Sequence, residues 1–490
     1  MPSIAELIEH REMVEETLSS AGFIVQEGSM QVLDCLALAS EGRLSSCFGN
    51  NAGSAYTALF LPPAPGQEAA KAPEGSGLPD EEPGVAAADG SVLPANPYFS
   101  PVGWSWKLRG DEAVLVLGYT PPACIYHSLV SYVLLSEDDS PAKEEGAEGD
   151  IFYHPTFASL GRSANMRTLK HEGTRPDLAS FAYLLTGDVR SAEVAAVALS
   201  KLGITDAGLN VHLLPAQVLS MGLGTGKDTF AVLGRASGPE DPGLFDQWLS
   251  AVADETVVLR LTPKKAFHLP APARSLAPRG TGMHEAGRIQ GVREGLAAIR
   301  DALVRQYGKD YEMEELPSRI AVTEGLTAYL DGRNAEGDNP DAAYLMTGDF
   351  TFESDEDFCV VYGVNHTRSG KATYSNVVLY AKPWLAGIAS IYDRSFEGSA
   401  EGYVPAEVAD PDDFYVFKLA RPGWALADGH TVEVPASTGN PRGRCYGADA
   451  GQPLFCAFRA YMEPETGTGP AYSELIWDRL MVFHKKGDAD

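Results

Sequence analysis

The sequence predicts an α+β protein that is mainly β, built from two related antiparallel units of the β-sandwich or jelly-roll kind. Three observations lead to this prediction: a set of landmarks that occurs twice, many short strand-like runs separated by Gly, Pro, Asn and Asp, and few helical patterns. Short strands at irregular spacing favour packed antiparallel sheets, because a parallel sheet needs a helical crossover after each strand. An N-terminal helix and a helical connector complete the predicted architecture.

Each copy of the repeat contains an aromatic pair, an acidic pair, a glycine that ends an apolar run, and two tyrosines six residues apart. The landmarks are Asn96, Pro97, Trp104, Trp106, Asp111, Glu112, Gly118, Tyr126 and Tyr132 in one copy, and Asn339, Pro340, Phe350, Phe352, Asp355, Glu356, Gly363, Tyr374 and Tyr380 in the other. A shorter match, residues 182–188 with 343–349, has a different offset. Both registers cannot report one duplication, and we favour the longer because it orders more landmarks.

The chain begins with an expected helical segment, residues 1–62, whose first 23 residues have the apolar spacing of an amphipathic helix. Residues 63–95 are rich in Pro, Gly, Ala and acidic residues, with almost no large apolar groups. Such a stretch buries too little apolar surface to offset its ordering entropy, so we expect a flexible linker there.

The first β-unit is expected over residues 96–280. The apolar runs 113–118 and 125–134 predict a hairpin whose connection contains Pro121 and Pro122, and residues 181–185 predict a further strand. Residues 192–202 and 242–252 are expected to be short helices.

A connector helix is expected within residues 281–310. Over residues 284–307 the apolar side chains recur every three or four residues and form one stripe. We expect this helix to pack between the two units. The second β-unit, residues 311–490, is predicted from the strand-like runs 358–363, 374–380, 414–419, 453–462 and 475–483.

The charge balance excludes some partners. The chain has 38 Lys and Arg against 67 Asp and Glu, a formal charge of −29, and such a surface repels nucleic acid and anionic lipid. No apolar run is long enough to span a bilayer, and the acidic N-terminus does not resemble a signal peptide. We therefore expect a cytoplasmic protein, although a secreted protein whose signal had been removed would have the same sequence. Homo-oligomer formation is compatible with the sequence.

The six cysteines give no sign of a metal site, because none forms a C-x-x-C pair. Buried thiols are the simplest expectation, with local Cys35–Cys47 and Cys445–Cys456 bridges as the alternative in an oxidising compartment. We expect no metal and no cofactor. Residues 221–227 resemble a phosphate loop, but Met221 stands at the first glycine position and Asp228 replaces the magnesium-binding hydroxyl.

The most reactive-looking segment joins the strands 358–363 and 374–380. It supplies the amide of Asn365, the imidazole of His366 and the ammonium of Lys371, followed by the phenol of Tyr374. Histidine is the side chain best suited to proton transfer near neutral pH, and Lys371 could hold an anion. The alternative, a polar solvated hairpin, is as consistent with the sequence.

Other polar side chains are candidates for the same site. Tyr126 and His127 occupy the first-unit position that corresponds to Tyr374, and His127 could approach His366 if the units face each other. Arg459 lies beside aromatic residues in a late strand and could bind an anion, or pair with a buried carboxylate. Arg162 lies in a polar turn that could line a pocket.

The C-terminal third of the chain resembles uncharacterised bacterial tandem β-sandwich proteins, which are built from paired domains of unknown function. The resemblance rests on the segments 415–418, 434–435, 458–461 and 469–470. It implies a two-part β fold and no activity.

Two functions remain open from the sequence. The first is a small-molecule enzyme of the lyase, isomerase or hydrolase type, without a redox cofactor. It would use His366, Tyr374 and His127 as catalytic groups in a cleft between the units, and Asn365, Lys371, Arg459, Tyr126 and Arg162 to bind a small polar or anionic metabolite. The alternative is a non-catalytic protein that binds a ligand or a partner.

Overall fold

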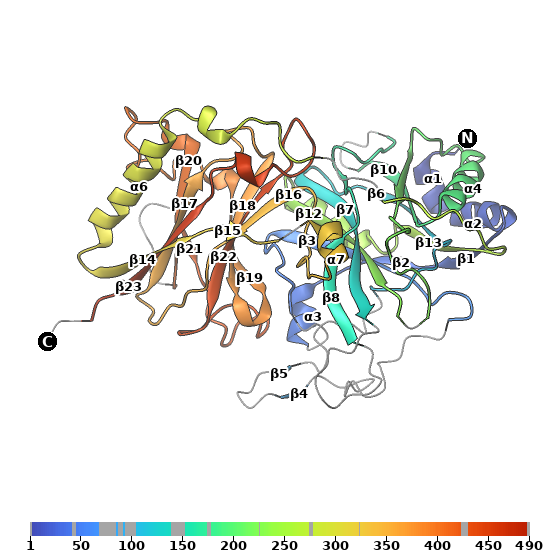
Figure 1. The fold of residues 1–490 in the computed structure, drawn as a ribbon, viewed down its shortest axis with the longest axis horizontal. Coiled ribbons are helices and arrows are strands. Elements are labelled where there is room, and N and C mark those ends of the chain that lie inside the picture. The colour runs from blue at the N-terminus through green and yellow to red at the C-terminus, as the bar shows by residue number, and fades with distance from the viewer. Residues whose placement is uncertain are drawn as a thin grey trace.

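The computed structural model describes residues 2–41, 46–67, 85–86, 92–93, 104–138, 152–173, 178–224, 226–273, 278–322, 324–422 and 430–487. Most of the expected linker 63–95 lies outside these residues. The fold is α+β and mainly β, as predicted, with four principal sheets of five or six strands (Figure 1). A short pair, β4 (Val85–Ala86) with β5 (Val92–Leu93), forms a fifth sheet.

The first half of the chain forms two sheets, which we call the first outer and first inner sheets. The outer sheet has the order β1-β13-β6-β10-β11, with bounds Phe23–Glu27, Val257–Pro263, Ala113–Tyr119, Ser180–Thr186 and Leu209–Leu213. The inner sheet has the order β2-β3-β12-β7-β8, with bounds Ser29–Val32, Ser54–Phe60, Thr229–Pro239, Cys124–Asp138 and Phe152–Ser159, and β9 (Ala164–Asn165) also pairs with β7.

The second half repeats this arrangement. Its outer sheet has the order β14-β23-β17-β20-β21, with bounds Tyr311–Pro317, Arg479–Lys485, Phe358–Val364, Phe414–Ala420 and Thr431–Glu433. Its inner sheet has the order β15-β16-β22-β18-β19, with bounds Arg319–Ile320, Ala342–Met346, Leu454–Tyr461, Tyr374–Ala381 and Ala386–Tyr392. We match the strands of the two halves in chain order and call matched strands counterparts. Each strand of the second half then has the same neighbours in its sheet as its counterpart in the first half, and the parallel pair β20–β21 corresponds to the parallel pair β10–β11.

The register of the strands follows the longer of the two sequence matches. Ala113 and Phe358 begin counterpart strands, and Tyr126 and Tyr374 lie opposite counterpart residues of β12 and β22. The shorter match joins β10, which lies between β6 and β11 in an outer sheet, to β16 of an inner sheet, so its two members do not correspond. This shorter match arises because each of the two apolar strands leads into a Thr-Gly-Asp sequence.

The layers follow one another across the molecule, with the two inner sheets in contact at its centre (Figure 1). β7 is largely apolar because both of its faces are buried: Leu129 and Val133 face the first outer sheet, whereas Val130 and Tyr132 face the second half. Successive strand residues point to opposite faces, so a strand buried on both sides carries apolar residues at most positions and not only at every second one.

Helices cover the outer sheets. The helices α1 (Ile4–Glu9), α2 (Arg11–Ser20) and α4 (Val189–Ser200) pack on the first, and α6 (Val292–Tyr307) packs on the second (Figure 1). The shorter helices are α3 (Cys35–Ser40), α5 (Pro242–Ala251), α7 (Gly325–Leu330), η1 (Glu285–Gly287), η2 (Lys382–Trp384), η3 (Asp393–Ser395), η4 (Pro411–Asp413) and η5 (Tyr472–Glu474).

Two expectations about the helices differ from the structure. The helix expected between the units, α6, instead covers the outer face of the second outer sheet, where Leu296, Ile299 and Leu303 are buried. The N-terminal segment is not only helical, because β1, β2 and β3 enter the two sheets of the first half. Amphipathic periodicity shows that a helix has a buried face, but it does not identify the sheet that covers this face.

The six cysteines are free thiols, so neither of the local bridges considered from the sequence is present. Cys359 and Cys456 are buried, as expected for thiols in apolar strands. No helix within the described ranges is long and apolar enough to cross a membrane.

Candidate functional site

His366, in the loop between β17 and β18, is buried between two carboxylates. Its Nδ1 is 2.7 Å from Glu285 Oε1, and its Nε2 is 3.3 Å from Asp478 Oδ2. Burial alone would lower the pKa of His366, but the charges of Glu285 and Asp478 raise this pKa well above its usual value. The imidazole is therefore held as a cation with an acceptor at each nitrogen.

The other polar groups of this loop are also engaged. Lys371 is fully buried, and its Nζ donates to Glu463 Oε1 and to Glu474 Oε2, each at 2.5 Å. Asn365 is buried, and its Oδ1 accepts a hydrogen bond from Thr367 Oγ1 at 2.7 Å. Acid–base catalysis at His366 stays a hypothesis that no observation tests, but the side chains proposed for it are bonded to the protein itself.

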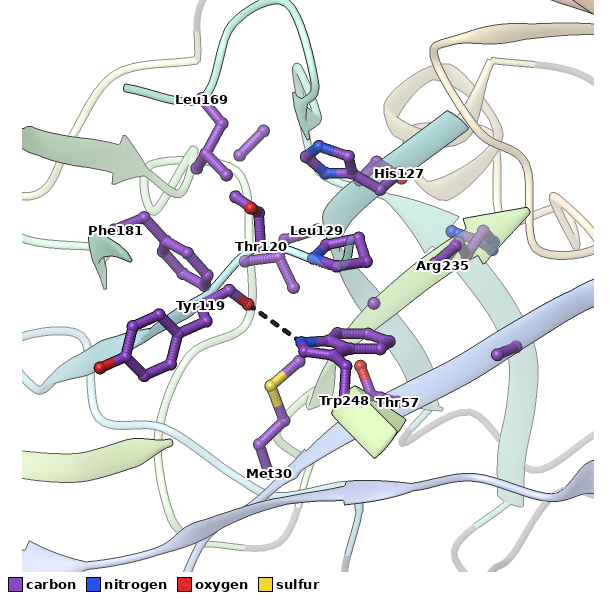
Figure 2. A pocket seen from close by; sticks show the side chains of 16 residues that line it. Met30, Thr57, Tyr119, Thr120, His127, Leu129, Leu169, Phe181, Arg235 and Trp248 are labelled. Atoms are coloured by element: carbon purple, nitrogen blue, oxygen red, sulfur yellow. Dashed lines mark hydrogen bonds between the residues drawn. The ribbon is translucent and has the colours of Figure 1, made fainter. Parts of the chain in front are cut away.

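His127 lies elsewhere, beside a small internal cavity of about 30 Å³ between the two sheets of the first half (Figure 2). Its neighbours there are mostly apolar and include Leu129, Phe181 and Trp248, whose Nε1 donates to Tyr119 O at 3.4 Å. Burial, with a smaller effect of His171, lowers the pKa of His127 to about 4. This volume is that of a single water molecule, so the cavity does not admit a metabolite.

The structure brings three of the sequence candidates together where the inner sheets meet. The rings of Tyr126 and Tyr374 are stacked with centroids 6.5 Å apart, and Tyr461 packs against both. Arg459 lies over the ring of Tyr380 at 5.5 Å. Arg162, by contrast, is exposed in the turn between β8 and β9.

A cleft of about 740 Å³ opens in the first half, next to the end of β10. It is bounded by the segment that follows β11 and by the segment that follows β13. The side chains around it mix charged, polar and apolar groups. They are Arg109, Asp111, Asp188, Ala216, Gln217, Leu219, Ser220, Met221, Lys227, Ala266, Phe267, His268 and Pro270, together with the backbone of Gly110 and Gly222.

Both carboxylates of the cleft are occupied by donors of the protein. Asp188 caps α4: Oδ1 accepts from Ser191 N at 2.9 Å, and Oδ2 accepts from Leu269 N at 2.5 Å. Asp111 accepts from Nε and Nη2 of Arg109, at 2.9 and 2.7 Å. Their role is to hold the walls of the cleft together.

Lys227 supplies a cation without a carboxylate partner. It makes no ion pair within the described part of the chain, and its Nζ lies 3.5 Å from Ser220 Oγ. Gly222 has a φ of +147°, and a Cβ there would lie 3.0 Å from Lys227 Cγ. The glycine therefore lets the lysine side chain fold back over its own loop.

The sequence contains a signal for this cleft that falls short of a recognised motif. Residues 221–227 lack the spacing of a phosphate loop, but they do place a glycine-rich turn and Lys227 at one wall. The other walls come from residues 109–111, 188 and 266–270. No local pattern joins these segments, because the sheet topology alone brings them together.

The two halves differ at the residue that follows β10 and its counterpart β20. Gly187 follows the last residue of β10, and Arg421 follows the last residue of its counterpart β20. A Cβ on Gly187 would lie 2.5 Å from Met221 Sδ and 3.0 Å from Ala216 Cβ. Arg421 is buried, and its Nη1 donates to Ala448 O in the segment that precedes β22. In the first half, Met221 and Ala216 pack where a side chain at position 187 would lie, whereas the second half has the arginine side chain itself at this position.

Within the described ranges, no cluster of three or more His, Cys, Asp or Glu side chains has an arrangement that could hold a metal ion. No protein-family model matches the chain, and no match was found among the curated proteins. The function is therefore inferred from the geometry of the site.

Proposed function

We propose that the protein is a ligand-binding protein without catalytic activity, and that the cleft of its first half binds a small anionic molecule. The observation that carries this proposal is a cleft of about 740 Å³ at whose wall Lys227 makes no ion pair within the described residues. Gly187 lies behind this wall, where it lets Met221 and Ala216 pack close to the backbone.

The dimensions of the cleft suit a small molecule. Its volume of about 740 Å³ lies within the range of roughly 300–1,000 Å³ that is usual for small-molecule sites. Leu219, Met221 and Phe267 offer apolar surface, whereas Ser220 and Gln217 offer polar groups. A metabolite with an apolar body and a charged end would fit this lining.

The charge of the ligand that the cleft prefers follows from which charged groups of the cleft already bond to the protein. Asp111 and Asp188 are bonded to protein donors, so they do not attract a cation strongly. The ammonium of Lys227 makes no ion pair with a carboxylate within the described residues. Arg109 donates to Asp111 from Nε and Nη2, so its Nη1 is left to bind a ligand. A carboxylate or phosphate could accept hydrogen bonds from both cations.

Thermal unfolding in the presence of a panel of small carboxylates and phosphomonoesters tests the proposal. A compound that binds the folded state raises the unfolding temperature as its concentration increases. For such a compound, Lys227→Met is expected to weaken binding roughly tenfold or more, since a hydrogen bond to a charged group is lost.

The matched control is Lys201→Met, which removes an exposed lysine of the same half away from the cleft. It should leave the affinity unchanged. An affinity that is the same in the wild type and in Lys227→Met would contradict the assigned site, and the absence of any stabilising compound would contradict the ligand class.

A further inference from the structure

The two halves meet through contacts that are repeated about a local two-fold axis. Asn51, in the loop before β3, donates from Nδ2 to the hydroxyl of Tyr374 in the other half, at 3.0 Å. Its counterpart Asn339, in the loop before β16, donates from Nδ2 to the hydroxyl of Tyr126, at 2.7 Å. Each half thus extends the same loop onto the same tyrosine of its neighbour.

The backbone of these two loops follows the same symmetry. Phe48 and Glu336 have φ values of +50° and +52°, and the glycines that follow them have values of +68° and +71°. Left-handed conformations at non-glycine residues are uncommon and persist where the surroundings fix them. Their occurrence at counterpart positions shows that both loops are shaped by the same contact.

Two arginines occupy counterpart positions in the centre of this contact. Arg235 lies opposite Tyr56 and Ser128 in its sheet, and Arg459 lies opposite Tyr344 and Asn376. Both come from the central strand of an inner sheet, β12 in the first half and β22 in the second.

Each guanidinium group packs against two aromatic rings in the same way. Arg235 lies over the rings of Tyr56 and Tyr132, at 5.7 and 5.4 Å from their centres. Arg459 lies over Tyr344 and Tyr380, at 5.4 and 5.5 Å. We call these two arginines and four tyrosines the central cluster.

The positive charge of the central cluster has no carboxylate partner. Neither Arg235 nor Arg459 forms an ion pair within the described residues, and the Nη1 atom of each is buried without a hydrogen-bond acceptor. Arg459 directs its Nη2 to Gly49 O and to the hydroxyl of Tyr380. Nη1 is thus unused at both counterpart positions.

The tyrosines do not neutralise this charge. Burial raises the pKa of Tyr344 well above its usual value and that of Tyr56 to about 12, so both phenols stay protonated. Both of these rings lie near enough to Arg235 and Arg459 to be affected by both charges. The cluster therefore contains two cations that share one set of neutral neighbours.

The buried carboxylates of the same interface are occupied elsewhere. Asp338 accepts from Ser159 N and Oγ at 2.8 and 2.6 Å, and burial raises its pKa to about 6. Asp341 accepts from Ser163 Oγ and from Asn165 Nδ2, at 2.6 and 2.9 Å. The Tyr126 hydroxyl also reaches Asp341, at 2.8 Å, but no arginine within the described residues does.

Arg459 is buried and Arg235 is mostly buried. Two such cations without a counterion are unfavourable, because each loses much of its hydration and they repel each other. We propose that the central cluster binds a small oxyanion with two negative charges, which accepts hydrogen bonds from Nη1 of Arg235 and Nη1 of Arg459. Guanidinium groups recognise carboxylate and phosphate oxygens with well-defined geometry, so phosphate, sulfate or a short dicarboxylate has the required chemistry. This anion would join the two halves, and its site is distinct from the cleft of the first half.

The first test uses the wild-type protein alone. The protein is purified and dialysed in buffer without phosphate, sulfate or carboxylates, then heat-denatured, and the released solute is identified by ion chromatography and mass spectrometry. Because Nη1 of both arginines is buried, the anion should survive dialysis and be released on unfolding, close to one per chain. Ion chromatography separates inorganic from organic anions, and the absence of any released dianion would overturn the proposal.

The second test assigns the anion to the arginines. Arg459→Met and Arg235→Met each keep an apolar stem but remove a guanidinium group, and each is expected to abolish the retained anion. The control Arg442→Met removes an exposed arginine that lies over Tyr446, outside the central cluster, and should retain it. Full retention in both cluster variants would overturn the assignment.

The two sites can be separated by one further variant. Lys227→Met alters the cleft but not the central cluster, so it should still release close to one anion per chain on denaturation. Loss of the anion in Lys227→Met would place it in the cleft and overturn this inference. If neither cluster variant folds, the wild-type measurement and the Lys227→Met comparison still decide the question.

Discussion

The two halves of the molecule share one strand order but use it differently. In the first half, Gly187 lets Met221 and Ala216 pack closely at one wall of an open cleft, whereas the second half has the buried Arg421 at the counterpart position. In the second half, the loop between β17 and β18 carries His366 and Lys371 inside a network of carboxylates, whereas the first half joins β6 to β7 with Pro121 and Pro122. The comparison shows that the polar loop between β17 and β18 supports the fold of the second half, whereas the open cleft lies in the first half.

The largest expected effect concerns the carboxylates on either side of His366. His366→Ala would leave Glu285 and Asp478 buried without their shared cation. Removing one partner of a buried charge pair costs about 3–5 kcal/mol, so we expect a loss of that size in the free energy of unfolding, measured in urea.

The control for this variant is Arg368→Ala in the same loop. Arg368 is about half exposed, and its ion pair with Asp410 lies at the surface, so its loss should cost less than about 1 kcal/mol. Equal costs for the two variants would show that the loop is an ordinary solvated hairpin.

A second comparison uses counterpart carboxylates at the start of β6 and β17. Glu112 is fully buried and bonds to Arg260 Nη2 at 2.6 Å, whereas Asp357 bonds to His484, which is 32% exposed. We expect Glu112→Ala to cost about 3–5 kcal/mol, and Asp357→Ala to cost roughly 1–2 kcal/mol, because His484 can be hydrated after the change. Urea unfolding measures both, and a larger cost for Asp357→Ala would contradict the assignment of the buried pair to the first half.

The pH dependence has a defined sign. Since the pKa of His366 is raised in the folded state, its charge contributes stability that is fully present below the usual histidine pKa and is lost as pH rises through the folded value. The difference in unfolding free energy between wild type and His366→Ala should therefore shrink toward alkaline pH. Glu285, with a lowered pKa, should lose its contribution on the acid side. A difference that grows with alkaline pH would contradict the charged state of His366.

The smallest expected effect is that of Arg421→Ala. Within the described residues, the side chain makes one hydrogen bond, to Ala448 O, and its Nε forms only a long ion pair with Asp355, at 3.9 Å. Its loss should cost no more than about 1 kcal/mol in urea unfolding and should leave ligand binding by the first half unchanged. A loss of ligand binding in this variant would show that the two halves do not act separately.

Much of the local structure could be predicted from the sequence. The runs 113–118, 181–185, 358–363 and 374–380 correspond to β6, β10, β17 and β18, with boundaries shifted by at most a few residues. Their alternating or continuous apolar pattern is a local property, and it identifies strands even when their partners are far away. The order of the repeated landmarks likewise follows the order of the strands.

The sites could not be predicted in the same way. Glu285 and Asp478, which bind His366, lie 81 and 112 residues from it, and no spacing rule connects them. From the sequence, Tyr374 is a candidate catalytic residue and Tyr126 a candidate ligand contact, because a phenol can donate a hydrogen bond, yet both pack in the interface between the halves. Gly187 gives no signal in the sequence, because the value of a glycine at that position depends on what surrounds it.

The affinity of Gly187→Arg for an anionic compound that stabilises the wild type tests the central claim most directly. The substitution displaces Met221 and Ala216, which line the cleft and lie against position 187. Isothermal titration calorimetry measures binding, and urea unfolding confirms that the variant is folded. We predict that binding is lost or weakened by more than about tenfold, a change of about 1.4 kcal/mol. An affinity equal to that of the wild type in a folded Gly187→Arg variant would contradict the assignment of the ligand to this cleft.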